Sequence, residues 1–241
     1  MAFTRYRTQA FALKERDRGE ADKIFTVFSK EFGKISILGK SIRMAKSKLR
    51  GNMSIFSLLD LEFIQGKSLK TLVDAELLEN YQNIKQNPNV LLTLSNIVDV
   101  FDKLVYGTEK ELRLWFLFKE VFDVLNNIDI DFAGFYVCHW FYWRLFAILG
   151  YCPELYHCLS CNKKLQISGS YFASRGGIIC SDCLSAEKGA IAMSTEAIKM
   201  SREIFQRSLD DFLKIKIKKN LQKSLEKNLE RIFIFHLSHI Y

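Results

Sequence analysis

Four cysteines carry the clearest chemical signal in this sequence, because they form two Cys-x2-Cys pairs with eighteen residues between the pairs. These residues are Cys158, Cys161, Cys180 and Cys183. Each pair can present two sulfurs from one tight turn, and the residues between can form a hairpin that brings the pairs together. The spacing predicts a closed, tetrahedral thiolate site for a structural Zn²⁺. Such a site holds a fold together and offers no open position to a substrate.

A pair of disulfides in a secreted protein is the alternative use of these cysteines. Residues 1–18 are charged throughout and lack the apolar segment of a signal peptide. We therefore expect a cytoplasmic protein, and the reducing conditions there favour a metal site over disulfides.

A run of basic residues is the second chemical signal. No acidic residue occurs between Phe32 and Leu59, whereas the same stretch holds Lys34, Lys40, Arg43, Lys46, Lys48 and Arg50. Residues 43–50 fall between two predicted strands, so we expect a loop whose cations can reach a phosphate backbone. That contact would be mostly electrostatic, tolerant of sequence and sensitive to salt. A solvated loop without a ligand is the alternative.

The remaining candidates form no convincing catalytic group. Residues 33–41 resemble a phosphate-binding P-loop, but five residues separate the glycines where the loop needs four, and the sequence favours a strand where the loop needs a helix. His236 and His239 have no carboxylate nearby in the sequence to complete a metal site. We expect His139, Cys138 and Cys152 to be packed in the core. The prediction is therefore a protein that is not an enzyme and has no catalytic residues.

The net charge of +8 is unevenly distributed. Residues 1–50 hold 13 Lys or Arg and 5 Asp or Glu, a balance of +8. Residues 214–231 hold 7 and 2, a balance of +5, and residues 51–213 balance to −5. This asymmetry indicates a polyanionic partner, with nucleic acid the leading candidate. Surface charge that serves only solubility is the alternative.

The scaffold for the basic run reads as short strands over the first 79 residues. Leu59, Leu61 and Phe63 alternate with acidic residues, which is the period of a half-buried strand. Glycines separate the apolar segments at turn positions. We predict five strands, over residues 8–15, 22–29, 34–42, 54–64 and 68–78. Five short strands in this length favour a small Greek-key barrel of the OB type.

The pattern changes to helical spacing after Tyr81. We predict helices that begin near Pro88 and near Glu109, a third over residues 132–149 with Asp131 as its N-cap, and two more over 194–206 and 213–241. The third is apolar nearly all round, but it is marginal in length for a bilayer and contains a central Arg144. We interpret it as a buried core helix and expect no membrane association.

The elements together predict an α+β multidomain protein. Residues 1–79 form the N-terminal OB-fold β-barrel, which would bind DNA. Residues 80–154 and 190–241 form an all-α helical domain. A small zinc module with four cysteine ligands, residues 155–189, is inserted in that helical domain.

Several stretches resemble the bacterial DNA repair protein RecO family. Residues 11–34 are similar to its opening strand, its Arg-Asp-x-Gly-Glu-x-Asp turn, here residues 16–22, and its Thr-x-x-x-Gly-Lys hairpin. Residues 40–43 and 46–51 resemble its basic loop, and residues 149–155, 158–161 and 176–183 resemble its junction with the zinc module. Ser41 and Asn162 stand where the family usually has glycine. Neither removes a charge or a ligand, so we expect neither to matter.

The resemblance implies a DNA repair and recombination mediator. Such a protein binds single- and double-stranded DNA, anneals complementary strands and helps to load recombinase on DNA coated with single-stranded DNA-binding protein. It implies RecR and the acidic C-terminal tail of the single-stranded DNA-binding protein as partners, in a nucleoid-associated cytoplasmic setting. The predicted DNA-binding residues are Arg16, Lys34, Lys40, Arg43, Lys46, Lys48 and Arg50.

Two other classes of function stay open. A zinc-stabilised adaptor could use its basic surface for acidic tails of partner proteins. A zinc enzyme acting on nucleic acid would need a nearby acid, for which Glu187 is the close candidate.

Overall fold

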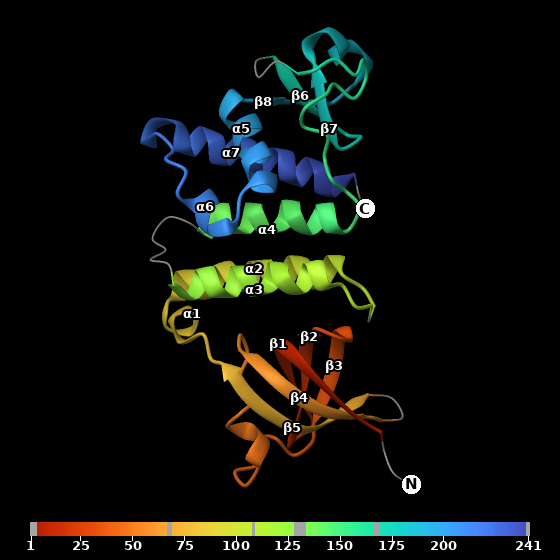
Figure 1. Cartoon of the computed structure of the whole chain (residues 1–241), viewed down its shortest axis with the longest axis vertical. Coiled ribbons are helices and arrows are strands. Elements are labelled where there is room, and N and C mark those ends of the chain that lie inside the picture. The colour runs from red at the N-terminus through yellow and green to blue at the C-terminus, as the bar shows by residue number, and fades with distance from the viewer. Residues whose placement is uncertain (1–3, 67–68, 108, 128–133, 166–168, 240–241) are drawn as a thin grey trace. The chain divides into compact units, whose positions relative to one another are not determined.

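The computed structural model describes residues 4–66, 69–107, 109–127, 134–165 and 169–239. The chain forms two compact units, Met1–Ile130 and Asp131–Tyr241. The first is built around strands and the second around helices (Figure 1).

The first unit contains a closed five-stranded barrel. Its strands are β1 (Arg5–Arg18), β2 (Asp22–Ser29), β3 (Gly33–Gly39), β4 (Leu58–Gln65) and β5 (Lys70–Glu79). They follow one another around the barrel in the order β1-β2-β3-β5-β4, and only the β3–β5 pair is parallel among these pairs. This arrangement confirms the predicted OB-like barrel. Ser68, which the prediction placed in the fifth strand, lies outside the described residues.

Residues 10–13 of β1 are buried on both faces, which explains why these four successive residues are apolar. Ala10 and Ala12 point into the barrel, where they pack with Phe25, Val27 and Leu61. Phe11 points the other way, and its ring centroid lies 4.8 Å from that of Trp115 and 4.7 Å from that of Phe122. Because successive strand residues face opposite sides, one strand can serve both packing surfaces.

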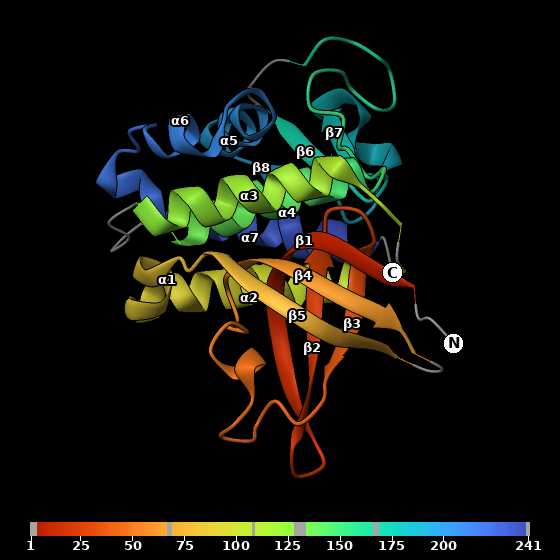
Figure 2. The ribbon, with the colours of Figure 1, turned by 60° about the horizontal axis from the view of Figure 1, so that its bottom comes forward.

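Three helices pack on the barrel within this unit. They are α1 (Gln82–Gln86), α2 (Pro88–Leu104) and α3 (Leu112–Asn127). Asn87 caps α2, since its side chain accepts hydrogen bonds from the backbone N–H groups of Asn89 and Val90, and Pro88 occupies the first turn as predicted. Phe28 of β2 joins the same aromatic layer through Phe101 and Phe118. Figures 1 and 2 show α2 and α3 covering one end of the barrel.

The second unit is organised around α4 (Gly134–Ile148), which is buried nearly all round. It is accompanied by α5 (Thr195–Gln206), α6 (Leu209–Leu213) and α7 (Lys219–Ser238). Arg144 of α4 donates from Nε to the carbonyl of Ile204 and from Nη2 to that of Arg207, so its charge caps the C-terminal end of α5. None of the described helices is both long enough and apolar enough to cross a membrane. The predicted N-cap Asp131 lies outside the described residues.

The cysteine region is a small sheet with a 3-10 helix. Its strands are β6 (Ser170–Ala173), β7 (Gly177–Cys180) and β8 (Ile191–Met193), in the order β7-β6-β8, and η2 (Ser181–Ala186) follows β7. Asn228 of α7 ties β8 in place, accepting from the N–H of Ser194 and donating to the carbonyl of Ala192.

The compact units divide the chain differently from the predicted domains. Helices α1 to α3 share a unit with the barrel, because the aromatic layer around Phe11 and Phe28 joins them to β1 and β2. The predicted boundaries at residues 79 and 154 stay predictions of domain organisation, since compactness is not a test of independent folding.

Candidate nucleic-acid interface and metal centre

The four cysteines converge on one point. Their sulfur atoms all lie within 4.8 Å of one another, and the Cys161 and Cys180 sulfurs are 3.8 Å apart. Four sulfurs around Zn²⁺ at about 2.3 Å would lie ~3.8 Å apart in a regular tetrahedron. Cys158 and Cys161 flank one turn, Cys180 ends β7, and Cys183 lies in η2. The described cysteines form no disulfide. This group could therefore hold a metal ion.

The surroundings of the sulfurs suit thiolate ligands. Burial alone would raise the pKa of Cys158, but hydrogen bonds from the backbone N–H groups of Cys161, Cys180 and Ser160 outweigh it and lower the pKa to about 6. The Cys180 N–H donates to the Cys158 sulfur over 3.4 Å. Hydrogen bonds from Cys183 to Cys180 and the other cysteines raise its pKa to about 12. Without a cation, the surroundings thus favour a thiolate at Cys158 and a neutral thiol at Cys183. A bound cation would favour the thiolate form of all four cysteines at once.

The hairpin that carries the cysteines is braced on both sides. Leu159 donates its N–H to the carbonyl of Ile178 over 3.0 Å, which joins the first Cys pair to β7. Glu187, the candidate acid of a zinc enzyme, is ion-paired with Arg175 and its side chain is 14% exposed. Arg175 also donates to Ser160 beside the first pair. Glu187 is thus part of the brace around the site.

The basic loop, residues 40–57 between β3 and β4, is a chain of tight turns. Backbone hydrogen bonds link Met44 to Ser41, Ser47 to Met44 and Arg50 to Ser47. The turns lead through η1 (Lys48–Arg50), and Figure 1 shows this part of the loop at the end of the barrel away from α2 and α3, whereas Figure 2 shows the same loop from another side. The prediction of a loop over residues 43–50 is therefore confirmed.

Both ends of the basic loop are anchored to the rest of the unit. Ile42 and Met53 are buried with the barrel core. The Ser41 N–H donates to Asp22 over 2.8 Å, and the Arg43 N–H donates to the carbonyl of Ala21 over 2.9 Å, so the β1–β2 turn holds the start of the loop. At its other end, Lys85 of α1 donates to the hydroxyls of Ser54 and Ser57.

The loop contains five predicted DNA-binding cations, all of them exposed: Lys40, Arg43, Lys46, Lys48 and Arg50. Within the described part of the chain, no hydrogen bond or ion pair engages the charged groups of Lys40, Lys46, Lys48 and Arg50. Arg43 differs, because it lies 3.3 Å from an Asp17 oxygen and donates to the Gly19 carbonyl over 3.2 Å. Arg43 thus helps to join the loop to the β1–β2 turn. Arg16, also predicted, is exposed on β1 next to that turn.

A pocket of about 320 Å³ lies beside the loop. Its apolar part is Phe25, Ile42 and Met53, and its charged part is Glu15, Lys23, Arg43 and Arg50. Lys23 forms an ion pair with Glu15, so this acid is neutralised where it adjoins the basic loop. The pocket and the loop cations together form a surface that suits an anion with an apolar portion. The sequence pattern did not indicate this pocket.

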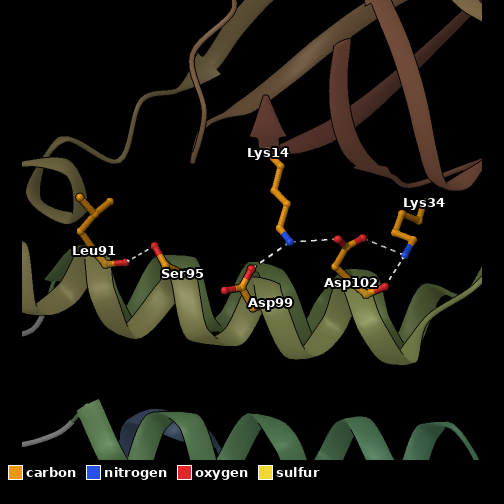
Figure 3. Close-up of polar contacts among 6 residues, drawn as sticks. All are labelled: Lys14, Lys34, Leu91, Ser95, Asp99 and Asp102. Atoms are coloured by element: carbon orange, nitrogen blue, oxygen red, sulfur yellow. Dashed lines mark hydrogen bonds and ion pairs between the residues drawn. The ribbon is translucent and has the colours of Figure 1, made fainter. Parts of the chain in front are cut away.

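Lys34 lies elsewhere and is not free. Its ammonium is 3.0 Å from an Asp102 carboxylate oxygen and donates to the Asp102 carbonyl over 2.8 Å, and its side chain is 15% exposed (Figure 3). Lys14 reaches the other Asp102 oxygen at 2.9 Å and Asp99 at 2.8 Å. This position does not support a DNA contact by Lys34. It instead forms, with Lys14, Asp99 and Asp102, a polar clamp between the barrel and α2.

A β-bulge makes the clamp possible. The register of β1 against β2 shifts between Ala12 and Lys14, so Lys14 leaves the face that Ala12 uses and points toward α2. Burial by itself would raise the pKa of Asp102, but hydrogen bonds and charge from Lys14 and Lys34 hold it below its usual value. The sequence prediction missed Lys14, because nothing in a single strand pattern indicates the bulge.

The histidines lie in structural settings. His139 is buried, and its Nδ1 lies 3.0 Å from the carbonyl of Phe135, one turn earlier in α4. His236 is buried between the rings of Trp143, Phe146 and Phe172, with centroid distances of 5.1–5.6 Å. Burial lowers the pKa of His139 to about 4 and also lowers that of His236. Cys152 is exposed, contrary to the prediction of a core position, whereas Cys138 is largely shielded.

Comparison with known proteins covers nearly the whole chain. Residues 1–81 match the family described as "Recombination protein O N terminal", and residues 85–241 match "Recombination protein O C terminal". The chain is 28% identical to a "DNA repair protein RecO" of Dehalococcoides mccartyi over 90% of this chain and 84% of the relative. It is 24% identical to one of Alkaliphilus metalliredigens over 97% and 94%, and 26% identical to one of Acetivibrio thermocellus over 89% and 85%.

Proposed function

Because this chain belongs to the RecO family of DNA repair proteins, we propose that it is a recombination mediator that binds single- and double-stranded DNA and anneals complementary strands. We also propose that the protein helps to load recombinase on DNA coated with single-stranded DNA-binding protein. The observation that carries the DNA-binding part is the basic loop, with five exposed cations on a closed barrel and no acidic residue between Phe32 and Leu59.

The chemistry requires no covalent step. Lys40, Lys46, Lys48 and Arg50 would neutralise backbone phosphates, while Arg43 keeps the loop against the β1–β2 turn. Annealing brings two polyanions together, so cations that neutralise phosphates lower the repulsion that opposes pairing. Aromatic stacking, which many OB-folds use, is less accessible here, because Phe25 in the pocket is 1% exposed. We therefore expect electrostatics to dominate the affinity.

The test is the salt dependence of DNA binding by a loop variant. Lys46→Ala, Lys48→Ala and Arg50→Ala together should weaken single-strand binding at least about tenfold and reduce the salt slope by roughly 2, since each single-strand phosphate contact contributes about 0.7. The matched control replaces the exposed Lys103, Lys110 and Arg113, in the same unit, and should bind as the wild type does. Fluorescence anisotropy with a labelled oligonucleotide measures both quantities.

An unchanged affinity and slope in the loop variant would refute the proposed interface. No affinity for oligonucleotides in the unaltered protein, together with binding of an acidic peptide by the basic loop, would instead favour the adaptor function.

We propose Zn²⁺ as the ion held by the four cysteines. A set of four thiolates at tetrahedral spacing is the donor set that zinc prefers in structural sites, and no position is left for a water or a substrate. The ion would stabilise the hairpin between the two Cys pairs. Metal analysis of the purified protein should give one zinc per chain.

RecR and the C-terminal tail of single-stranded DNA-binding protein are the proposed protein partners, and the proposed location is the cytoplasm, on the nucleoid. A strand-annealing assay on DNA coated with its single-strand-binding protein tests DNA binding, partner recognition and activity together. Annealing of bare DNA but not of coated DNA would count against the tail as a partner.

A further inference from the structure

Helix α7 presents a row of cations on its exposed face. Lys223, Lys227 and Arg231 are exposed and follow one another at four-residue intervals. The opposite face is buried through Leu225, Leu229, Ile232, Phe233 and His236. Residues four apart share a helix face and are separated by about 6 Å along the axis. The cations thus form a ridge and not a single point.

The ridge continues into the segment that precedes α7. Lys216 and Lys218 are exposed there. We call these five cations, Lys216, Lys218, Lys223, Lys227 and Arg231, the α7 ridge.

Residues 214–231, which contain the ridge, account for the whole net positive charge of residues 131–241. Residues 131–241 contain 15 Lys or Arg and 10 Asp or Glu, of which 7 and 2 lie in residues 214–231. The rest of the unit therefore contains 8 of each and is neutral. A distribution that served only solubility would not need to gather the excess on one stretch.

Some other described cations of the unit are ion-paired, whereas those of the ridge are not. Lys214 is ion-paired with Asp210 and Asp211, and Arg207 with Glu203. Over the described ranges, no ion pair engages a cation of the ridge. The exposed Glu230 shares this face without forming such a pair, and Glu226 accepts a hydrogen bond from Gln222.

We propose that the α7 ridge is a second nucleic-acid site, which binds the phosphate backbone of a DNA strand without reading its bases. This inference rests on the proposed DNA-binding function and extends it. It gives the second unit a binding site for a DNA strand, in addition to the site on the basic loop of the first unit. A linear row of unpaired cations matches a linear polyanion. The exposed apolar residue on this face is Ile234, so the described surface offers little for the apolar side chains of a peptide.

The proposal gives annealing a physical basis. A protein with one strand site can only screen the charge of the strand it holds. A protein with two sites, one on each compact unit, raises the local concentration of a second strand near the first. The two sites are sequence-tolerant, so any pair of complementary strands would be served.

The test is the number of short strands that one chain binds. An oligonucleotide of about ten nucleotides fits within the range of lengths that a single OB-fold occupies. Calorimetric titration at low salt should give two strands per chain for the unaltered protein and one for the variant with Lys223→Ala, Lys227→Ala and Arg231→Ala. The loop variant should also bind one. Replacing Lys163, Lys164 and Lys188, three exposed cations of the same unit, by Ala removes equal charge and should leave two.

A charge-conserving variant and the other possible outcomes distinguish a second DNA site from misfolding, from a single DNA site and from a site for acidic proteins. Lys223→Arg, Lys227→Arg and Arg231→Lys should restore two strands, which shows that the loss in the Ala variant is not misfolding. One strand per chain in the unaltered protein, or two in the ridge variant, would overturn the inference and leave the proposed function standing. No DNA binding at all would instead refute the proposed function. Binding of a polyglutamate peptide that is lost in the ridge variant, with the strand count unchanged, would make the ridge a site for acidic proteins and overturn the inference.

Discussion

Ser41 and Asn162, at the two positions where the resemblance leads us to expect glycine, both adopt the left-handed backbone conformation. Their φ angles are +50° and +57°. The sequence prediction discounted both positions because neither carries a charge or a metal ligand, but backbone conformation is the property that glycine supplies there. Ser41 lies at the root of the basic loop, and Asn162 follows the second cysteine of the metal group.

We expect Ser41→Gly to stabilise the protein by about 0.5–1 kcal/mol. A left-handed conformation costs an L-residue about 1–2 kcal/mol, and the greater chain entropy of unfolded glycine offsets about half of that gain. Asn162→Gly is the control and should change the free energy of unfolding little, because asparagine tolerates this conformation. Urea unfolding of the three proteins measures the difference. A destabilised Ser41→Gly variant would show that the serine side chain does more than occupy a strained position.

Lys34 shows at the residue scale what a sequence pattern leaves undetermined. Ile35 and Ile37 face the barrel interior, so the alternation correctly places Lys34 on the outer surface. Whether the Lys34 side chain is solvated or covered depends on Asp102, which lies 68 residues later in the sequence, on α2. The exposure of the cations in the basic loop was easier to predict, because a loop between two strands lies on the surface whatever the packing of the other elements.

At the scale of elements, the strands and helices were largely predictable and their irregularities were not. Alternation and helical spacing come from the local sequence, so β2 and α5 begin or end within a residue of the predicted limits. The bulge in β1 and the pocket beside the basic loop depend on partners distant in the sequence. These features decide which side chains meet, and they therefore decide the site.

The polar clamp between the barrel and α2 should make stability depend on pH in a defined window. The pKa of Asp102 is lower in the folded protein, so its contribution is present above the unfolded value of about 4 and is lost as the pH falls through the folded value. The pKa of Lys14 is raised, so its contribution is present below about 10.4 and is lost at higher pH.

Asp102→Asn should therefore destabilise the protein by about 1–2 kcal/mol at pH 7, a value reduced for partial exposure, and the difference from wild type should shrink below about pH 4. Asp99→Asn is the matched control on the same helix. Asp99 is 59% exposed and pairs with Lys14 alone among the described cations, so we expect less than about 0.5 kcal/mol. Denaturant unfolding of each variant between pH 3 and pH 9 gives the comparison. A difference that is constant down to pH 3 would contradict the role of the Asp102 charge.

The cysteine hairpin lies close to α7 at Gly176, which faces His236. Gly176 has φ +81°, and a Cβ added there would lie 3.1 Å from His236 Cε1. Gly189, in the same unit, has φ +86° with no atom within 4 Å of an added Cβ. Gly189→Ala should thus report backbone strain alone, at about 1 kcal/mol, and Gly176→Ala should cost roughly 1 kcal/mol more. Thermal unfolding distinguishes them, and equal costs would mean that His236 moves freely away from the hairpin.

At the scale of the whole molecule, the metal group and the basic loop belong to different compact units. The cysteines lie in residues 131–241, and the loop lies in residues 1–130. The core around the loop, from Phe25 to Ile42 and Met53, contains no cysteine ligand among its described members. The cysteine hairpin instead packs against α7, which carries the proposed second strand site.

Removal of the metal should therefore affect the two units unequally. We expect a chelator to destabilise the second unit by about 3 kcal/mol, which lowers its thermal midpoint by roughly 10–20 °C, while the first unit unfolds as before. Below that midpoint the protein should still bind one short oligonucleotide through the basic loop with unchanged affinity. As the second unit loosens, the second strand and the annealing activity should be lost, because α7 is supported by the hairpin through Gly176 and His236. Calorimetric unfolding followed by strand titration on the same samples measures both effects. A metal-free protein that keeps both thermal transitions but binds no DNA would place the metal in the DNA interface and contradict its role as a support for the fold.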